Sequence, residues 1–148
     1  MFGLYRLIGL SIMLLCTQFA GAAVKSKSAD QYHLMHTAES NLSAEDLWQR
    51  LLRPQDWWDD SHTYSGNADN LSLQPVAGGH WLEKWGENSV VHGQVMLVLD
   101  GKQLRLTAPF GPLQGLGVSV VWTITIEPQG EGSIVTFEEI ASGTPASD

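Results

Sequence analysis

A chain of 148 residues with 16 acidic and only 8 basic residues has a net charge of −8, which disfavours nucleic acids and anionic lipid headgroups as partners. Its length fits one domain that buries roughly two thirds of its unfolded surface. The single cysteine excludes a disulfide within the chain.

The first 22 residues have the pattern of a secretory signal peptide. Arg6 supplies a positive start, residues 7–15 are almost wholly apolar, and Ala20-Gly21-Ala22 places small residues where a signal peptidase cuts. The apolar run is shorter than the roughly 20 residues of a membrane-spanning helix, so an uncleaved anchor is the less favoured alternative. We therefore expect a secreted, periplasmic protein that loses Cys16 with its signal and begins with a linker over residues 23–30.

The mature domain opens with a predicted strand over residues 31–38, where apolar and polar side chains alternate. His33, Met35 and His36 lie close together in this strand, a combination found in copper sites. A strand places His33 and His36 on opposite faces, so we predict no metal site here. The sequence contains no phosphate-binding loop, nucleophile elbow or Cys and His cluster, and we predict no cofactor.

The best-marked helix follows Ser43. Ser43 is a favourable N-cap, Asp46 completes a capping box, and Pro54 ends the helix. Its apolar face contains Leu47, Trp48, Leu51 and Leu52. A second short helix is predicted over residues 54–60. Its Trp57-Trp58 pair has two open interpretations: the lip of a binding site, or two rings that anchor the helix to a sheet edge.

From residue 71 onward the chain has the pattern of an antiparallel β-meander. Turn signals rich in Gly, Asn, Asp and Pro separate six predicted strands. The strands cover residues 71–75, 80–85, 90–99, 103–108, 116–127 and 133–140. Together with residues 31–38, they predict an α+β fold with about seven strands in a curved antiparallel sheet and two short helices on one side.

The strand over residues 116–127 has the most regular alternation in the chain. Its apolar face carries Val118, Val120, Trp122, Ile124 and Ile126. Such alternation is typical of a sheet with one wet face and one face packed on a core or a cavity. We therefore expect Trp122 in the wall of a core or a cavity.

One hairpin has a predictable register. If Glu87-Asn88 is a two-residue loop, Glu83 pairs directly with His92. A carboxylate beside an imidazole could serve acid–base chemistry or orient a polar ligand group, and an exposed pair worth a few tenths of a kcal/mol is the other interpretation. Leu82 and Val91 make the opposite face the expected core side, which favours the exposed pair.

A series of short motifs runs through residues 30–143. In order they are Trp57-Trp58, His62-Thr63-Tyr64-Ser65-Gly66, Leu71-Ser72-Leu73, Gly78-Gly79 with Glu83, Val91-His92 with Val95, Leu104-Arg105-Leu106, and Gly111-Pro112-Leu113-Gln114. Together they resemble the START and polyketide-cyclase-like superfamily (SRPBCC), near its branch of activator of heat-shock-protein ATPase homologues. The resemblance implies a helix-grip fold, in which a curved sheet wraps a long C-terminal helix and leaves a hydrophobic cavity. Members bind lipids, sterols, polyketides or other apolar molecules, and some catalyse cyclisation or aromatisation.

The chain departs from this pattern in three places. His80 and Trp81 stand where smaller residues are expected and would narrow a cavity, and Asp100-Gly101 replaces a common Pro-Gly turn. Residues 144–148 end the chain without an amphipathic segment for the gripping helix. The resemblance then implies an uncovered face made of Val95, Leu97, Leu104, Leu106, Val118, Val120, Trp122, Ile124 and Ile126. Such a face is expected to dimerise, to accept a partner's helix or to capture an apolar ligand.

We predict a secreted, non-catalytic binding module for a hydrophobic small molecule or lipid. The expected ligand contacts are Trp122, Tyr64, Trp85, His92, Val120 and Ile124. An enzyme of the cyclase or hydrolase kind is the first alternative, and it would use Glu83 and His92. The second alternative is an interaction protein whose open groove accepts a partner helix, and a homodimer through the same face is a related expectation.

The signal peptide generates the first testable prediction. N-terminal sequencing of the periplasmic protein should start at Ala23 or Val24, because cleavage is expected just before one of them. Membrane-bound protein that retains Met1 would contradict this prediction.

Overall fold

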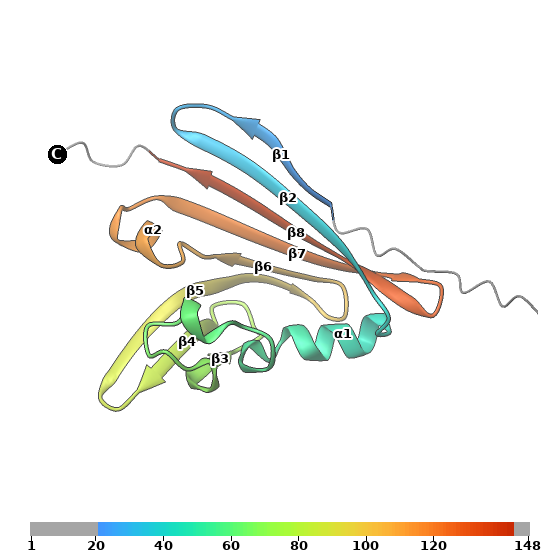
Figure 1. The fold of residues 1–148 in the computed structure, drawn as a ribbon, viewed down its shortest axis with the longest axis horizontal. Helices are drawn as coiled ribbons and strands as arrows, with labels where there is room; N and C mark the ends of the chain where they lie inside the picture. Colours follow the sequence, from blue (N-terminus) through green and yellow to red (C-terminus); the bar gives the residue numbers. More distant parts are fainter. Residues whose placement is uncertain (1–20, 144–148) are drawn as a thin grey trace, which may run out of the picture.

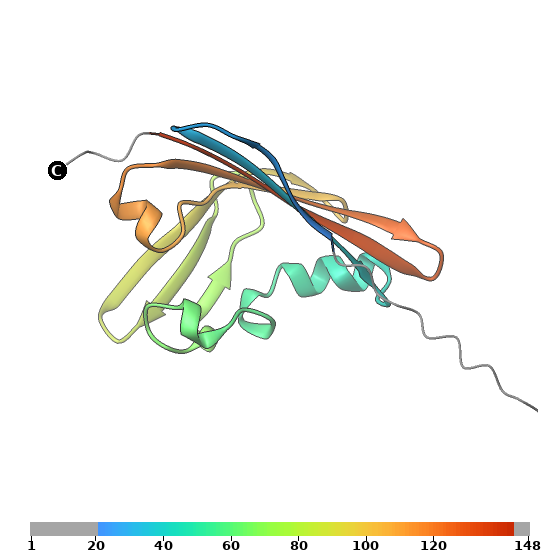
Figure 2. The same cartoon turned by 45° about the horizontal axis from the view of Figure 1, so that its top comes forward.

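The computed structural model describes residues 21–143, which form one curved sheet of eight antiparallel strands with short helices on one side (Figure 1, Figure 2). The strands are β1 (Gly21–Lys27), β2 (Gln31–Ser40), β3 (Leu71–Leu73), β4 (His80–Trp85), β5 (Asn88–Leu99), β6 (Gln103–Thr107), β7 (Ser119–Gln129) and β8 (Gly132–Ser142). The helices are α1 (Ala44–Leu51) and α2 (Pro112–Gly115), with 3-10 turns at Pro54–Asp56, Asp60–His62 and Ala68–Asn70.

Neighbouring strands follow the order β1-β2-β8-β7-β6-β5-β4-β3. This arrangement confirms the predicted α+β class with a curved antiparallel sheet, and it has one strand more than expected. Most of the expected signal peptide and the tail over residues 144–148 lie outside the described residues. The prediction that no gripping helix follows β8 also concerns residues outside this range.

The additional strand, β1, lies where a linker was expected over residues 23–30. It pairs with the edge of β2, with Ala22 opposite His36 and Val24 opposite Leu34. All its side chains are exposed. Its residues therefore show no alternation, and only the hydrogen-bond ladder of β2 makes this segment a strand.

Helix α1 begins as predicted. The Ser43 hydroxyl accepts a hydrogen bond from the Asp46 amide at 3.1 Å, and Trp48 is buried against the sheet. The expected second helix over residues 54–60 is instead two separate 3-10 turns, because the extended backbone of Asp59 interrupts it. Within residues 21–143, no helix has the length and hydropathy needed to cross a membrane.

The concave face of the sheet is buried over β5, β6 and β7, which contradicts the expectation of an open face. Its buried residues, each at most 2% exposed, include Val95, Leu104, Leu106, Val120, Ile124 and Ile126. Helix α1 lies on the concave side of the sheet (Figure 2). The cover comes from Trp48 and Leu51 of α1 and from the partly buried Trp57 and Trp58. Burial of each such apolar side chain contributes about 1.5 to 3 kcal/mol, so this cover accounts for much of the core.

A β-bulge in β5 changes which of its side chains reach the core. The register shifts between Val95 and Leu97, and Val98 is the residue that pairs with the buried Leu104. Leu97 pairs with Arg105 on the other face. The prediction that Leu97 faces the core is therefore wrong, because a bulge adds a residue that alternation does not count.

The β4–β5 hairpin differs from its predicted register. The loop is Gly86-Glu87, one residue earlier than expected, and Glu83 lies opposite Val90. Gly86 has a φ of 54°, which this tight turn requires. His92 is then a diagonal neighbour of Glu83, and both side chains are buried, whereas Val91 is exposed. The core lies on the side of Glu83 and His92, opposite to the prediction.

Leu104→Ala in β6 should lower the free energy of unfolding by about 2 to 5 kcal/mol, because this side chain is fully buried. Leu99→Ala on the neighbouring strand is the matched control. Its side chain is 49% exposed, and its loss should cost about 0.5 kcal/mol. Urea unfolding measures both variants, and equal losses would contradict the placement of the core on this face.

Candidate functional site

Two of the hollows in the described part of the chain have mainly apolar walls that include aromatic rings. The first, which we call the histidine groove, has a volume of about 550 Å³ and lies between residues 61–64, His92 and residues 110–112. The second, the concave pocket, has a volume of about 430 Å³ and lies over β1, β2, β8 and β7. Small-molecule sites measure roughly 300 to 1,000 Å³. In the described part of the chain, no three His, Cys, Asp or Glu side chains are placed to hold a metal ion.

A buried carboxylate lies behind the histidine groove. Glu83 Oε2 is 2.8 Å from His92 Nε2, and the two side chains are at most 5% exposed. Glu83 also accepts hydrogen bonds from the amides of Tyr64 at 3.1 Å and Ser65 at 2.6 Å. Burial raises the pKa of Glu83, but the hydrogen bonds from Ser65, Tyr64 and His92 outweigh burial and hold that pKa below its usual value. The group is therefore a carboxylate at neutral pH.

The ionised carboxylate determines which nitrogen of His92 carries a proton. A carboxylate only accepts hydrogen bonds, so Nε2–H of His92 donates to Glu83. In the neutral ring, Nδ1 is then an acceptor. No described residue makes a hydrogen bond with Nδ1. This atom is not fully buried. Since His92 lines the groove, Nδ1 can accept a hydrogen bond from a molecule bound there.

Two loops meet beside His92. The Tyr64 hydroxyl donates to the carbonyl oxygen of Gly111 at 3.4 Å, which joins the loop before β3 to the loop after β6. The His92 ring lies 5.6 Å from the nearly parallel ring of Phe110 and 5.8 Å from Tyr64. The imidazole is therefore set among aromatic rings, with one nitrogen held by Glu83 and the other available to the groove.

A cluster of aromatic rings separates the two hollows. The ring centroids of Phe110 and Trp122 are 4.6 Å apart, and Phe110 is also 5.3 Å from Trp58 and 5.1 Å from Trp81. Phe110 and Trp58 line the histidine groove, whereas Trp122 lines the concave pocket. Trp81 is almost fully buried in this cluster, and its bulk occupies space between the hollows.

The Trp57-Trp58 pair combines both of its interpretations. Trp57 packs against the core, and its Nε1 donates to the carbonyl oxygen of Leu51 at 3.4 Å. Trp58 lines the groove, and its Nε1 donates to the carbonyl oxygen of His62 at 3.1 Å. The first ring anchors this segment to the core, and the second is a wall of the groove.

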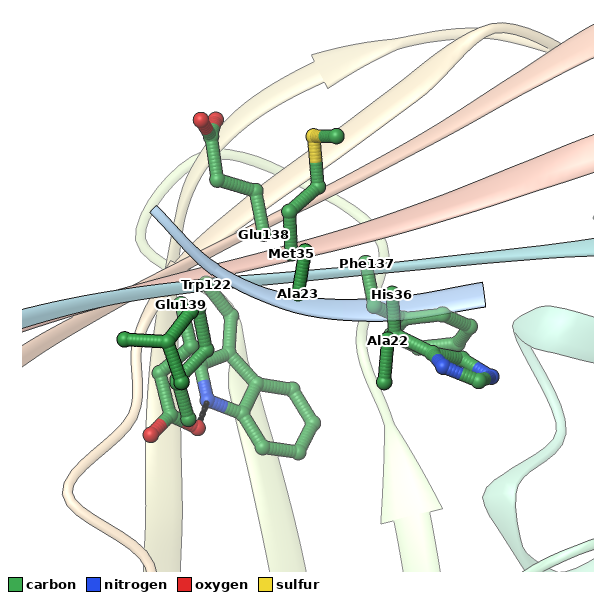
Figure 3. A pocket seen from close by; sticks show the side chains of 10 residues that line it. Ala22, Ala23, Met35, His36, Trp122, Phe137, Glu138 and Glu139 are labelled. Atoms are coloured by element: carbon green, nitrogen blue, oxygen red, sulfur yellow. Dashed lines mark hydrogen bonds between the residues drawn. The ribbon is translucent and has the colours of Figure 1, made fainter. Parts of the chain in front are cut away.

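The carboxylate of Glu139 is one of the polar groups of the concave pocket, with His36 and Glu138. Glu139 accepts hydrogen bonds from Trp122 Nε1 (Figure 3) and from the Tyr32 hydroxyl, both at 2.5 Å. Burial and the nearby Glu139 raise the pKa of Tyr32 to about 12, so its hydroxyl keeps its proton. Figure 3 shows Trp122, Phe137 and Glu139 on one side of the sheet, while Glu138 points to the opposite side.

The structure brings some of the predicted contact residues together and separates others. Those that line one of the hollows are Tyr64, His92 and Trp122. Val120 and Ile124 are buried in the core and line neither hollow. Trp85 lies at the end of the β4–β5 hairpin and also lines neither.

Sequence reasoning missed Phe110 and Glu139. Phe110 lies between Pro109 and Pro112 in a loop, where no periodicity assigns a side chain to a face. An aromatic residue between two prolines was the only available signal. Glu139 follows Glu138 in a strand, and alternation places one carboxylate on each face. Once the core face is known, the sequence therefore predicts that one of these carboxylates points to the concave side.

Glu83→Gln should lower the free energy of unfolding at pH 7 by about 1.5 to 3 kcal/mol, because three hydrogen bonds to a buried charge are weakened. The pKa of Glu83 is lowered on folding, so its stabilisation is present above about pH 4.3, the usual pKa of a glutamate, and is lost as the pH falls below that value. The pH dependence of unfolding should therefore be weaker in Glu83→Gln.

Glu138→Gln is the matched control for this prediction. The His33–Glu138 pair has the same 2.8 Å separation, but its side chains are 28% and 36% exposed, so its loss should cost at most about 1 kcal/mol. Urea unfolding at neutral and acidic pH measures both variants. Equal losses at pH 7 would show that burial does not distinguish the two pairs.

The chain matches no protein-family model and no curated protein, but several solved structures are similar to it. CalU16 from Micromonospora echinospora is 10% identical with a TM-score of 0.52, over 86% of this chain and 72% of that one. A protein from Rhodobacter sphaeroides is 16% identical with a TM-score of 0.54, over 84% and 81% of the two chains. A norcoclaurine synthase point mutant from Thalictrum flavum, in complex with a transition-state analogue, is 16% identical with a TM-score of 0.53, over 81% and 80%.

These identities are low, so the likeness shows the fold alone. The similar structures have the START and polyketide-cyclase-like (SRPBCC) fold. The expected relation to the branch of heat-shock-protein ATPase activators stays a prediction. The chain has the curved-sheet, α+β fold of the START and polyketide-cyclase-like proteins.

Proposed function

We propose that the protein is a secreted, periplasmic and non-catalytic binding module that holds a hydrophobic small molecule in the histidine groove. The observation that carries this proposal is the buried Glu83–His92 pair, 2.8 Å apart, directly behind a groove with aromatic walls. Similar structures support it, since a norcoclaurine synthase with this fold is in complex with a transition-state analogue. The signal-peptide pattern of the first 22 residues supports export.

The groove favours a flat, apolar ligand with one hydrogen-bond donor. Trp58, Tyr64 and Phe110 supply aromatic surface, and burial of apolar ligand area against it contributes roughly 25 cal/mol per Å². His92 Nδ1 is an acceptor beside these rings, and a ligand hydroxyl would donate to it. A site of this kind rejects an analogue without the hydroxyl, because the acceptor would lose its solvent and gain no partner.

The hydrogen bonds of Glu83 are those of a rigid binding site. Two of its donors are the amides of Tyr64 and Ser65, so the same carboxylate fixes the loop at the edge of the groove and the orientation of His92. Side chains held in this way lose little conformational freedom when a ligand binds. This arrangement serves recognition without requiring turnover.

An acid–base enzyme is the second candidate, and the same pair favours it. An imidazole whose Nε2–H donates to a buried carboxylate is oriented to take a proton at Nδ1. Glu83 would stabilise the imidazolium that forms, and a ligand hydroxyl or acidic C–H beside Nδ1 would be the proton donor. Conversion of a bound molecule by the unaltered chain, lost in Glu83→Gln, would favour this candidate over a binding module.

The interaction-protein alternative loses its main support. It required an uncovered concave face that a partner's helix could occupy. Trp48 and Leu51 of α1, with Trp57 and Trp58, already pack against the buried residues of that face. A homodimer through the same surface loses the same support.

2-Naphthol and 2-methoxynaphthalene test the proposed role of His92, because only the first has a hydroxyl that Nδ1 can accept from. We expect 2-naphthol to bind at least about tenfold more tightly in isothermal titration calorimetry, equivalent to about 1.4 kcal/mol. His92→Phe keeps an aromatic ring and should remove this preference. His33→Phe is the matched control, since His33 pairs with Glu138 away from the groove, and it should retain the preference.

Two results would contradict the proposal. One is equal affinity of the unaltered chain for both naphthalene compounds. The other is a preference for 2-naphthol that survives in His92→Phe, which would place the hydroxyl elsewhere.

A further inference from the structure

The concave pocket lies on the part of the sheet that α1 and the tryptophan pair leave open. Leu34 of β2 is 38% exposed and Val24 of β1 is 64% exposed, and both line the pocket together with Trp122 and Phe137. Figure 3 shows Trp122 and Phe137 projecting to the same side of the sheet. The pocket therefore offers a mainly apolar surface, on which the carboxylate of Glu139 and the imidazole of His36 are the polar groups of this side.

Glu139 has hydrogen-bond donors but no positively charged partner within residues 21–143. The ion pairs there are His33–Glu138, Arg53–Asp56 and His92–Glu83. Its two donors, Trp122 Nε1 and the Tyr32 hydroxyl, are neutral, so they hold the carboxylate in place without balancing its charge. A carboxylate that is partly removed from water and lacks an opposite charge favours binding of a cation.

We propose that the concave pocket binds an organic cation, a primary ammonium group on an apolar body, with its charge against Glu139. A carboxylate has about four acceptor positions, and two of those on Glu139 are occupied. The ammonium donates to a free position, and a charge-assisted hydrogen bond of this kind is roughly twice as strong as a neutral one. The Trp122 ring adds an aromatic surface to the same site, and the apolar body lies along Leu34 and Val24.

Charge complementarity selects this occupant over others. A fatty acid or an anionic lipid would place its negative headgroup against Glu139, and the net charge of −8 adds to the repulsion. A neutral apolar molecule would cover Glu139 without balancing its charge, which costs free energy. An amine both fills the apolar surface and neutralises the carboxylate.

This site is separate from the histidine groove. The rings of Phe110 and Trp122, 4.6 Å apart and tilted to each other, form the wall between the two hollows. Glu139 bonds to Tyr32 and Trp122, and neither of them lines the groove. The two proposals can therefore succeed or fail independently.

Hexylammonium, hexan-1-ol and hexanoate test the proposal, because they share one apolar chain and differ in the charge of the headgroup. In NMR titrations of the protein, we expect hexylammonium to bind at least about tenfold more tightly than hexan-1-ol. Hexanoate should bind most weakly. The resonance of the Trp122 indole Nε1–H should shift with hexylammonium, because that proton is bonded to Glu139.

Three variants test whether Glu139 causes the preference for hexylammonium. Glu139→Gln keeps an acceptor for Trp122 but removes the charge, and it should reduce the preference for hexylammonium to less than about twofold. Glu138 also borders the pocket, but it points to the opposite side of the sheet, where it pairs with His33 (Figure 3), so Glu138→Gln should retain the preference. His92→Phe should also retain it, which separates this site from the histidine groove.

Equal binding of hexylammonium and hexan-1-ol overturns the proposal, and so does an equal loss of preference in the two Gln variants. If Glu139→Gln does not unfold cooperatively, the unaltered chain decides the question with the three headgroups alone. Preference for hexylammonium with a shifted Trp122 resonance then supports the proposal. Hexan-1-ol or hexanoate bound as tightly, or an unshifted Trp122 resonance, overturns it.

Discussion

The carboxylate of Glu83 fixes the loop before β3 to the β4–β5 hairpin. It accepts hydrogen bonds from the amides of Tyr64 and Ser65 and from the imidazole of His92, so the loop before β3 and the strands β4 and β5 converge on one charge. A buried charge is tolerated only when its acceptor positions are used. The three donors therefore stabilise the carboxylate, and the carboxylate in turn fixes the loop and the ring that form the histidine groove.

The molecule contains the same chemical pair twice, and burial gives the two pairs different roles. Glu83–His92 and His33–Glu138 have equal separations of 2.8 Å. The first pair is nearly inaccessible to water, whereas the second is about one third exposed. Water screens the second pair and competes for its hydrogen bonds, so only the first can orient a ring precisely enough for recognition or acid–base chemistry.

The aromatic cluster shapes the chemistry of both hollows. Phe110, Trp58, Trp81 and Trp122 fill the space between them, so the concave side offers two smaller sites in place of one large cavity. One site presents an imidazole nitrogen and the other a carboxylate. The same rings provide apolar surface to each, and the polar group beside them sets the class of ligand.

Local patterns alone determined the α+β class, the capped start of α1 at Ser43 and most strands of the meander, because each of these depends on residues close together in the chain. The closeness of Glu83 and His92 could also be predicted, although the register behind it was wrong. Which face is the core depended on a turn one residue earlier and on bulges in β5, and a shift of one residue exchanges the two faces of a strand. Strand β1 forms only because it pairs with β2, so no local sequence pattern predicts it. The meeting of Phe110 with Trp122, and the cover of the sheet by the first helix, join segments distant in sequence, and only packing in three dimensions decided them.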